Sequence, residues 1–508
     1  MVGLSTAAFL AWHGVPSLAV ERHGGTAIHP RAAHFHLRTL EVFRAMGMEE
    51  DVRRKSEEQY DSDGGISAIE SLAGNEIAKY IPSLNAGVEA VSPSRRLFLT
   101  QEALEPILRE HALRLGVELR YGTELVDFEE SGDGVIGVTR SLDSGEERRI
   151  HARYLVACDG WRSPVRDRLG ISMDGHGLIS NSITIYFRAD VAQYVTGRTE
   201  AVFYVFNDTM RGFFRLDRGY QTGFLVVNTA GDVSLPEATN VAEGITRERA
   251  EQLLRSAIGV PDIDVEVLDI APWKAIADNA ASFQRGRVFL AGDAAHTMPP
   301  NGGFGGNTGV QDAFNLAWKI AHVLDGRAGA ELVDTYSAER QPVGRLTIEQ
   351  AYTRYVLRTA PYLGTDHIQP IVDDLSLEIG HRYRSSAVVP DGSDDDGLPY
   401  VDPRESRALP GTRAPHLWVR DGVSTLDLFR RNLTVLSATP VEVPEGVDVH
   451  VIDHPDFRSA YGIEPDGAVL VRPDGYVAWR QPEAASTAAI KDAVRSVLRT
   501  ERSQLSAL

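Results

Sequence analysis

"GRVFLAGDAAHTMPPNGGFGGNTGVQDAFNLAWKIA" (residues 286–321) is the stretch that decides how this chain folds. It opens with an apolar segment, residues 288–291, that is typical of a short buried strand and ends two residues before Asp293. Five glycines within residues 302–309 then let the backbone approach a ligand closely. Apolar residues recur at helical spacing from there to Leu324. The stretch therefore predicts a strand, a glycine-rich loop and a long helix whose N-terminal amides favour negative charge.

Two further acids lie at the ends of predicted strands. Glu21 ends the strand-like residues 17–21, and Asp159 follows the buried strand predicted at residues 154–158. An aspartate in such a place is also a common cap for the next helix. Ligands of open α/β sheets bind at the carboxyl ends of the strands. Together with Asp293, these acids therefore predict one extended ligand with several hydroxyl groups.

The start of the chain reads as the second half of a dinucleotide-binding unit. Gly3 matches the third glycine of G-x-G-x-x-G, and Glu21 matches the acid that binds a ribose. The strand and the first two glycines of that motif would precede Met1. A signal peptide is the alternative, but no Lys or Arg precedes the apolar residues 4–12 and no small-residue cleavage site follows them.

Composition narrows the possible partners. A chain of 508 residues predicts several domains. The net charge of −19, from 52 basic and 71 acidic residues, argues against nucleic acid or an anionic membrane as a partner. Cys158 is the single cysteine, which excludes internal disulfides and multi-cysteine metal sites and fits a reducing cytoplasm. No apolar run reaches the roughly 18 residues that a membrane helix needs.

Two motifs carry a family resemblance. "ACDGWRSPVR" (residues 157–166) resembles the DG motif of the flavoprotein aromatic hydroxylases, and residues 286–321 closely resemble their GD motif. These are the single-component FAD monooxygenases related to para-hydroxybenzoate hydroxylase. The similarity runs from residue 3 to about residue 345 and includes "YSAERQPV" (residues 336–343). With its length and its C-terminal tail, the chain looks most like the branch that modifies aromatic polyketides and like the related phenol hydroxylases.

The resemblance implies an α/β fold with three domains. A Rossmann-like FAD-binding domain, with its N-terminal strand missing, would comprise residues 1–70, 96–170 and 275–385. An antiparallel-sheet substrate-binding domain would comprise residues 71–95 and 171–274, where β-branched and aromatic runs alternate with turns. A thioredoxin-like domain would comprise residues 398–508. It has no Cys-x-x-Cys, so dithiol chemistry is excluded and a structural or dimer-contact role is expected.

The resemblance also implies a set of cofactor-binding residues. Glu21 would bind the adenosine ribose of FAD, Asp293 the ribityl hydroxyls, and Asp159 would lie near the pyrophosphate and the groove for NADPH. Arg166 would assist there or form a surface ion pair, and His296 would be a structural hydrogen-bonding residue. The complete predicted set is Gly3, Glu21, Arg22, Arg38, Gln101, Asp159, Asp293, Pro300, Gly302, Gly303, Gly305, Gly306 and Asn307.

The implied reaction is hydroxylation of a phenolic, polycyclic aromatic polyketide. NADPH reduces FAD, oxygen adds to the flavin C4a carbon, and the hydroperoxide gives its distal oxygen to the ring. The substrate is expected between the flavin and the predicted sheet, in a monomer or homodimer, with no metal and no assigned catalytic base. Its predicted wall residues are Tyr204, Phe206, Arg211, Phe213, Arg215 and Phe224.

Three other functions compete with this one. Baeyer–Villiger oxygen insertion or epoxidation would use the same scaffold with a different substrate pose. A flavin halogenase would carry Trp-x-Trp-x-Ile-Pro, whereas "PWKAIADNA" (residues 272–280) offers Trp273 alone. A non-enzymatic, FAD-deficient binding protein is the third, because the phosphate-binding loop would lie upstream of Met1.

From Gly3 we expect the native polypeptide to extend upstream by one strand and a turn, on the order of 10–20 residues. The chain as given is then expected to hold FAD poorly, because its pyrophosphate contacts are incomplete. Mass spectrometry of the native N-terminus, with flavin absorbance of the purified protein, checks this. A mature protein that begins at Met1 and holds flavin tightly would refute it.

Overall fold

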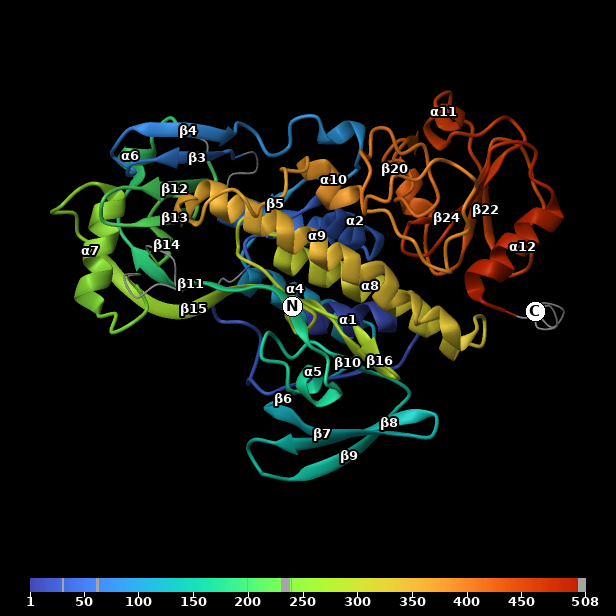
Figure 1. The fold of residues 1–508 in the computed structure, drawn as a ribbon, viewed down its shortest axis with the longest axis horizontal. Coiled ribbons are helices and arrows are strands. Elements are labelled where there is room, and N and C mark those ends of the chain that lie inside the picture. The colour runs from blue at the N-terminus through green and yellow to red at the C-terminus, as the bar shows by residue number, and fades with distance from the viewer. Residues whose placement is uncertain (30–31, 61–63, 199, 230–237, 239, 501–508) are drawn as a thin grey trace.

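Two long helices cross the centre of the molecule, α8 (Phe304–Leu324) and α9 (Thr335–Arg358) (Figure 1). The computed structural model describes residues 1–508 except 30–31, 61–63, 199, 230–237, 239 and 501–508. Every residue of α8 from 307 to 322 is buried, because the other elements pack around it on all sides. The long helix predicted behind the glycine loop, as far as Leu324, is confirmed.

Short parallel strands lie beside α1 (Val2–Trp12), which packs on α8 and on α4 (Gln101–Arg114). They form two separate groups: β1 (Leu18–Glu21) with β6 (Glu118–Tyr121), and β10 (Leu155–Ala157) with β17 (Val288–Leu290) and the edge strand β16 (Gln284–Arg285). The strands predicted at residues 17–21, 154–158 and 288–291 are confirmed to within one residue at each end. Their carboxyl ends open toward the same side as the N-terminus of α8, which places Glu21, Asp159 and Asp293 around one space.

A large, mostly antiparallel sheet forms a second layer (Figure 1, left). Its strands lie in the order β18 (His296–Thr297), β15 (Glu266–Ala280), β11 (Met173–Arg188), β14 (Thr222–Val227), β13 (Arg211–Leu216), β12 (Val202–Phe206), β3 (Ile66–Ile69) and β4 (Glu76–Ile81). The sheet extends past the predicted boundaries at residues 71 and 274. β3 pairs in parallel with β12, and β15 follows β11 along its whole length to Ala280.

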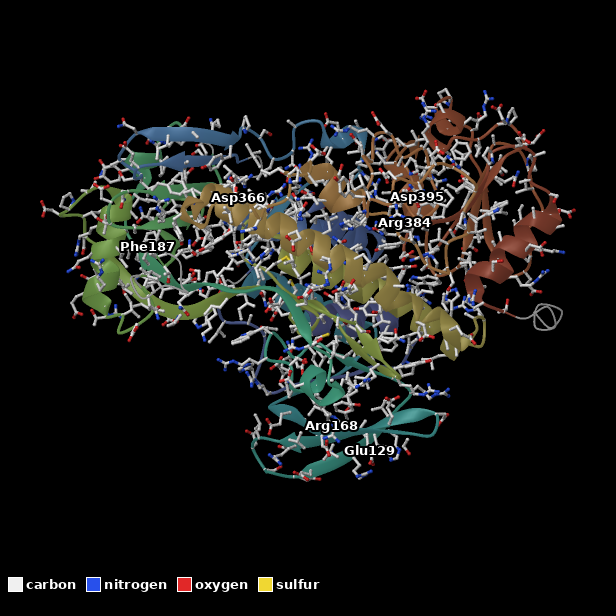
Figure 2. All side chains as sticks on the ribbon, in the orientation of Figure 1. Glu129, Arg168, Phe187, Asp366, Arg384 and Asp395 are labelled. Carbon is white, nitrogen blue, oxygen red and sulfur yellow. The ribbon has the colours of Figure 1, made fainter. Side chains whose placement is uncertain are left out.

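The two faces of this sheet differ. Phe187, Phe214 and Leu225 point to one face and pack with Leu253 and Ala257 of α7 (Arg247–Ile258), which covers that face; Phe187 is labelled in Figure 2. Because side chains alternate along a strand, the residues between them point to the opposite face, toward α8 and the parallel strands. That opposite face is the one available to a ligand.

The remaining elements surround these layers. A three-stranded sheet of β7 (Thr123–Ser131), β8 (Gly134–Ser141) and β9 (Glu147–Ala152) lies at the bottom of Figure 1, and Glu129 of this sheet is labelled in Figure 2. The others are β2 (His34–Phe35) paired with β5 (Leu97–Phe98), α2 (Leu37–Ala45), α3 (Glu49–Gln59), α5 (Pro164–Leu169), α6 (Ala192–Val195) and α10 (Asp374–Ile379). None of the helices in the described part of the chain is both long and apolar enough to span a membrane.

The C-terminal region is a separate α/β unit, seen at the right of Figure 1. Its four-stranded sheet has the order β22 (Asp448–Val451), β21 (Thr434–Ser437), β23 (Ala468–Val471) and β24 (Val477–Gln481). β21 and β22 are parallel, and the other pairs are antiparallel. The hairpin β19 (Trp418–Arg420) and β20 (Val423–Ser424), with α11 (Phe457–Tyr461) and α12 (Thr487–Leu498), completes it.

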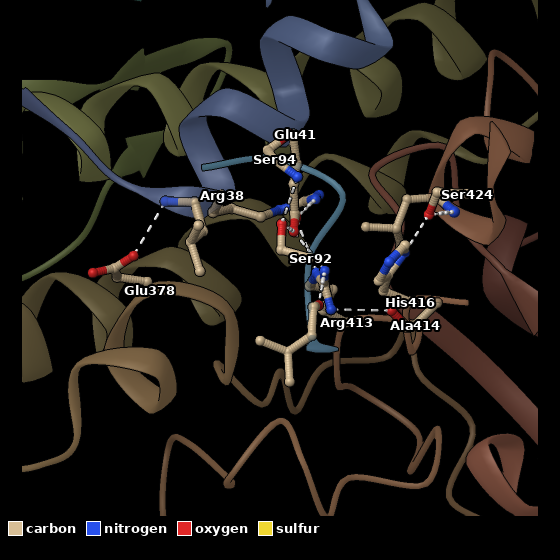
Figure 3. Close-up of polar contacts among 12 residues, drawn as sticks. Arg38, Glu41, Ser92, Ser94, Glu378, Arg413, Ala414, His416 and Ser424 are labelled. Carbon is tan, nitrogen blue, oxygen red and sulfur yellow. Dashed lines mark hydrogen bonds and ion pairs between the residues drawn. The ribbon is translucent and has the colours of Figure 1, made fainter. Parts of the chain in front are cut away.

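Buried ion pairs dock this C-terminal unit onto the rest of the chain. Arg472, at the end of β23, donates to both carboxylate oxygens of Glu339 on α9, at 2.6 and 2.8 Å. Lys319 on α8 donates to the same carboxylate at 2.8 Å. Figure 3 shows a second contact, in which the guanidinium of Arg413 reaches Glu41 on α2, and the carboxylate of Glu41 also accepts from Ser92.

Glu339→Gln should destabilise the protein by about 3 kcal/mol, because Lys319 then keeps a buried charge without a carboxylate partner. Burial alone would raise the pKa of Glu339, but Arg472 and Lys319 hold the pKa of this carboxyl well below its ordinary value. Urea unfolding of both proteins measures the loss. Glu57→Gln is the matched control, since Glu57 pairs with Arg53 on the exposed face of α3, and it should cost less than about 0.5 kcal/mol. An equal effect of the two substitutions would contradict the assignment.

Candidate active site

A cavity of about 2540 Å³ lies where the parallel strands, the N-terminus of α8 and the open face of the large sheet meet. The strand-end acids Glu21, Asp159 and Asp293 all line it. Asp159 also accepts a hydrogen bond from the backbone N–H of Val165 at 3.2 Å, so it caps the start of α5 while one side faces the cavity. The two interpretations of this aspartate, ligand contact and helix cap, are thus compatible in one geometry.

The glycine-rich loop forms the wall nearest to α8. Gly302 and Gly303 have φ angles of +93° and +72°, in the left-handed region that favours glycine. A Cβ on Gly302 would lie 2.3 Å from the ring of Phe304. The carbonyl of Gly302 accepts from Nε2 of His36 at 2.9 Å, and the carbonyl of Gly303 accepts from Nδ2 of Asn307 at 2.7 Å. The backbone of the loop therefore lines the cavity directly, while hydrogen bonds from His36 and Asn307 fix its carbonyl groups.

A buried carboxylate connects the two halves of the motif. Asp312, fully buried in α8, accepts from the backbone N–H of Gly292 at 3.1 Å and from Nε2 of His296 at 2.7 Å. Arg340 on α9 donates to its other oxygen at 2.8 Å. Burial would raise the pKa of Asp312, but His296 and Arg340 hold the pKa of this carboxyl below its ordinary value. The network fixes the turn that carries Asp293, and His296 acts in it as a structural partner.

Sequence reasoning missed Asp312 and Arg340. One signal for Asp312 is present in the sequence, since it is an acid within a helix whose neighbours Val310, Ala313 and Phe314 are apolar. A charge at such a position has to find a partner inside the protein. The sequence pattern could not show which residue supplies that partner.

Most of the predicted cofactor residues line the cavity. They are Gly3, Glu21, Arg22, Gln101, Asp159, Asp293, Pro300, Gly302, Gly303, Gly305 and Gly306. Gln101 is held at the cavity wall, where its Nε2 donates to Glu105 at 2.7 Å.

Two predicted cofactor residues do not line the cavity. Arg38 is buried against the C-terminal unit, where its guanidinium donates to Glu41 at 3.0 Å and to the backbone carbonyl of Asp474. Asn307 has its side chain committed to Gly303, His34 and His36 behind the loop. Arg166, also buried, donates to the carbonyl of Ala294 at 3.1 Å, which supports the turn, and it pairs with the exposed carboxylate of Asp167 at 3.5 Å. Arg38 and Asn307 differ from the prediction for the same reason. Each side chain is already hydrogen-bonded within the protein and is therefore not directed into the cavity.

The open face of the sheet supplies the opposite wall. Tyr204, Phe213, Arg215 and Phe224 line the cavity as predicted, and they form neighbouring cross-strand pairs, Tyr204 with Phe213 and Arg215 with Phe224. Phe206 and Arg211 share the face but lie at the far end of their strands, outside the cavity. Alternation along a strand predicts which face a residue lies on but not its place along the strand, so their role as substrate contacts stays a prediction.

The fold is α/β, and its cavity offers room for a dinucleotide cofactor beside an aromatic-lined sheet. Residues 1–351 match the family described as "FAD binding domain", and residues 407–500 match "Aromatic-ring hydroxylase, C-terminal". The chain belongs to this family of FAD-dependent aromatic hydroxylases, as its DG and GD motifs indicate. This confirms an enzyme over the alternative of a non-enzymatic binding protein.

Several relatives match along nearly the whole chain. A 4-methyl-5-nitrocatechol 5-monooxygenase of Burkholderia sp is 51% identical, covering 98% of this chain and 96% of the relative. A putative polyketide hydroxylase of Streptomyces halstedii is 39% identical, covering 98% and 95%. Among solved structures, a ternary complex of aklavinone-11 hydroxylase with FAD and aklavinone superposes with a TM-score of 0.89 at 35% identity, covering 98% and 97%.

The residues that line the cavity fit FAD. At Gly302 and Gly303 a Cβ would press on Phe304 or His34, so glycine lets the backbone itself form the cavity wall. The carboxylates of Glu21 and Asp293 suit the hydroxyls of a ribose and a ribityl chain. Within the described residues, no group of three or more His, Cys, Asp or Glu side chains could hold a metal ion.

Gly303→Ala should weaken FAD binding about tenfold, because the new Cβ would lie 3.2 Å from Nδ1 of His34 and push the loop toward the cavity. Gly326→Ala is the control, since Gly326 has nearly the same φ, +71°, but nothing within 4 Å of its Cβ position. Titration of each protein with FAD, followed by flavin fluorescence, gives both dissociation constants. Similar losses in the two variants would show that backbone strain, not the cavity wall, sets the effect.

Proposed function

We propose that this chain is an FAD- and NADPH-dependent monooxygenase that hydroxylates a phenolic ring. The observation that carries the proposal is that one cavity joins the strand-end carboxylates and glycine loop to the aromatic face of the sheet. A cofactor along the first wall and an aromatic ring on the second would meet at the loop of Pro300, Gly302 and Gly303.

When bound, the flavin supplies the redox chemistry and the activation of oxygen, with NADPH as the proposed electron donor. The chain's own residues then bind, orient and exclude water. Glu21 would accept hydrogen bonds from the adenosine ribose and Asp293 from the ribityl hydroxyls. The free N–H groups at the start of α8 would stabilise negative charge on the ring system, since this end of a helix carries partial positive charge.

The sheet face would position the substrate ring. Tyr204, Phe213 and Phe224 are largely buried or half-buried aromatic side chains that pack edge-to-face or tilted against their neighbours. Such a wall binds an aromatic ring through its apolar surface and keeps water from the reacting atoms. No side chain in this wall is an evident base for the hydroxyl proton.

Two classes of phenol are candidate substrates. The relative at 51% identity is named for a compact nitrocatechol, whereas the Streptomyces relatives are named for polyketides. We place the compact, acidic catechol first because the higher identity extends over 98% of this chain. The polycyclic polyketide predicted from the sequence is the second candidate, supported by the likeness to the aklavinone-11 hydroxylase complex.

We also infer that the C-terminal unit is thioredoxin-like. A parallel pair, β21 and β22, followed by antiparallel β23 and β24 and a closing helix, α12, supports this. Its contacts with α8 and α9 through Glu339 give it a structural role in the same chain.

The FAD-loaded protein should oxidise NADPH slowly alone and at least tenfold faster with a true substrate, because productive use of the flavin requires the ring in place. The measurement is NADPH consumption with 4-methyl-5-nitrocatechol and with a hydroxyanthraquinone, followed by mass spectrometry of products formed under ¹⁸O₂. One labelled oxygen in the product of either phenol supports the proposal. Acceleration by neither phenol, or product without label, would count against it.

A further inference from the structure

Asn301 is the only residue with a polar side chain in the glycine-rich loop at residues 299–306. It is 4% exposed and does not line the cavity, although its neighbours on both sides do. Its Nδ2 donates to the hydroxyl of Thr359 at 3.1 Å and reaches the hydroxyl oxygen of Tyr204 at 3.5 Å. Asn301 therefore supplies every side-chain hydrogen bond that this loop can donate.

The backbone around Asn301 is a tight turn. The N–H of Gly303 donates to the carbonyl of Pro300 at 2.9 Å, and Gly302 has the positive φ that the third position of a type II turn requires. The carbonyl of Gly302 accepts from His36 at 2.9 Å. His36 thus fixes this turn to the cofactor-binding layers, and Asn301 fixes it to different elements.

The partners of Asn301 belong to the substrate side of the cavity. Tyr204 lies on β12 and lines the cavity, where its ring packs against Phe213 with ring centres 5.7 Å apart. Thr359 directly follows the last residue of α9 and is 3% exposed. Its backbone N–H donates to the carbonyl of Tyr355 at 2.8 Å, so the end of the helix holds its hydroxyl in place. Asn301 therefore joins the loop to the sheet wall and to α9.

The same helix also holds the segment that precedes the loop. Arg340 on α9 donates to Asp312, which fixes the turn that carries Asp293. Thr359, at the C-terminal end of this helix, holds the loop itself through Asn301. Because a helix is a rigid support, these two contacts set the position of the loop relative to the sheet.

We propose that Asn301 is a positioning residue that fixes the distance between the cofactor ring at the loop and the substrate ring at the sheet. This rests on the proposed function. Transfer between two bound groups depends steeply on their separation, and a displacement of about 1 Å costs up to about 100-fold in rate. The other side chains of the loop are apolar or absent, so none of them can replace the hydrogen bond to Thr359.

A displaced loop would cause loss of coupling rather than loss of NADPH oxidation. In the coupled reaction, NADPH, a proton and O₂ convert a ring C–H bond to C–OH, and the other products are NADP⁺ and one water. In the uncoupled reaction, NADPH, a proton and O₂ give NADP⁺ and hydrogen peroxide, and the phenol is unchanged. Each route consumes one NADPH, so the hydrogen peroxide formed per NADPH reports how well the two rings are positioned.

The test uses Asn301→Ala and Thr359→Val, which each remove one partner of the hydrogen bond, and the double variant. Thr359→Ser keeps the hydroxyl. Thr347→Val is the matched control, because Thr347 lies on the same helix and its hydroxyl donates only to carbonyls of that helix, at 3.0 Å. The measurements on the FAD-loaded proteins are the FAD dissociation constant, the thermal midpoint and the hydrogen peroxide formed per NADPH with 4-methyl-5-nitrocatechol present.

We expect Asn301→Ala and Thr359→Val each to raise the hydrogen peroxide formed per NADPH by at least about threefold. The FAD dissociation constant should change by less than about threefold, because the loop keeps its bond to His36. The double variant should match the more affected single variant in peroxide yield and in midpoint, because the second substitution removes a bond that is already broken. Thr359→Ser and Thr347→Val should behave as the wild type.

An unchanged peroxide yield in Asn301→Ala, or effects of the two substitutions that add in full in the double variant, would overturn the proposal. If Asn301→Ala does not fold, the yields of Thr359→Val and Thr359→Ser decide in the same way, and equal yields overturn it.

The proposed function fails separately, when the wild type oxygenates no phenol. The positioning role is then decided by the midpoints and by iodide quenching of the bound flavin, which Asn301→Ala should make steeper than Thr347→Val does. Equal quenching in these two variants would overturn it. A wild type that oxygenates a phenol and loses no coupling in Asn301→Ala keeps the reaction and loses the positioning role.

Discussion

The buried carboxylate of Asp312 is the interaction on which the site depends. It joins the turn after β17, through Gly292 and His296, to the middle of α8 and to Arg340 of α9. A carboxylate in this position is stable only because three donors satisfy it, and removing any of them would leave charge exposed to an apolar interior. Its consequence is geometric. The strand-end acid Asp293 and the glycine loop, which lie on either side of His296 in the sequence, are held against the same helix.

The C-terminal unit extends this scaffold. Arg340 also donates to the hydroxyl of Tyr383 at 3.0 Å, and Glu339, one residue earlier, receives Arg472 from the end of β23. The same helix α9 therefore carries one partner for the flavin-side turn and one for the C-terminal unit. A site that binds a cofactor and an aromatic substrate needs such rigid support to keep the two in a fixed relative position. It also explains why Arg38, expected at the cofactor, is used for docking instead.

Local patterns in the sequence predicted the elements that carry the site, and they could do so for physical reasons. The strand before Asp293, the helix as far as Leu324 and the strands ending near Glu21 and Asp159 follow from apolar periodicity and from glycine. The structure differs from the expectations where the position of a side chain depends on distant residues. Whether Asn307 faces a ligand depends on His34 and His36, and whether Arg211 reaches the cavity depends on where β13 crosses it.

A crystal structure of the FAD-loaded protein with bound 4-nitrocatechol tests the central claim most directly. The account predicts the flavin ring against Pro300 and Gly302–Gly306, its adenosine end toward Glu21, and the catechol between this ring and the sheet. A flavin whose ring lies away from the glycine loop, or a catechol bound outside the space between loop and sheet, would contradict it.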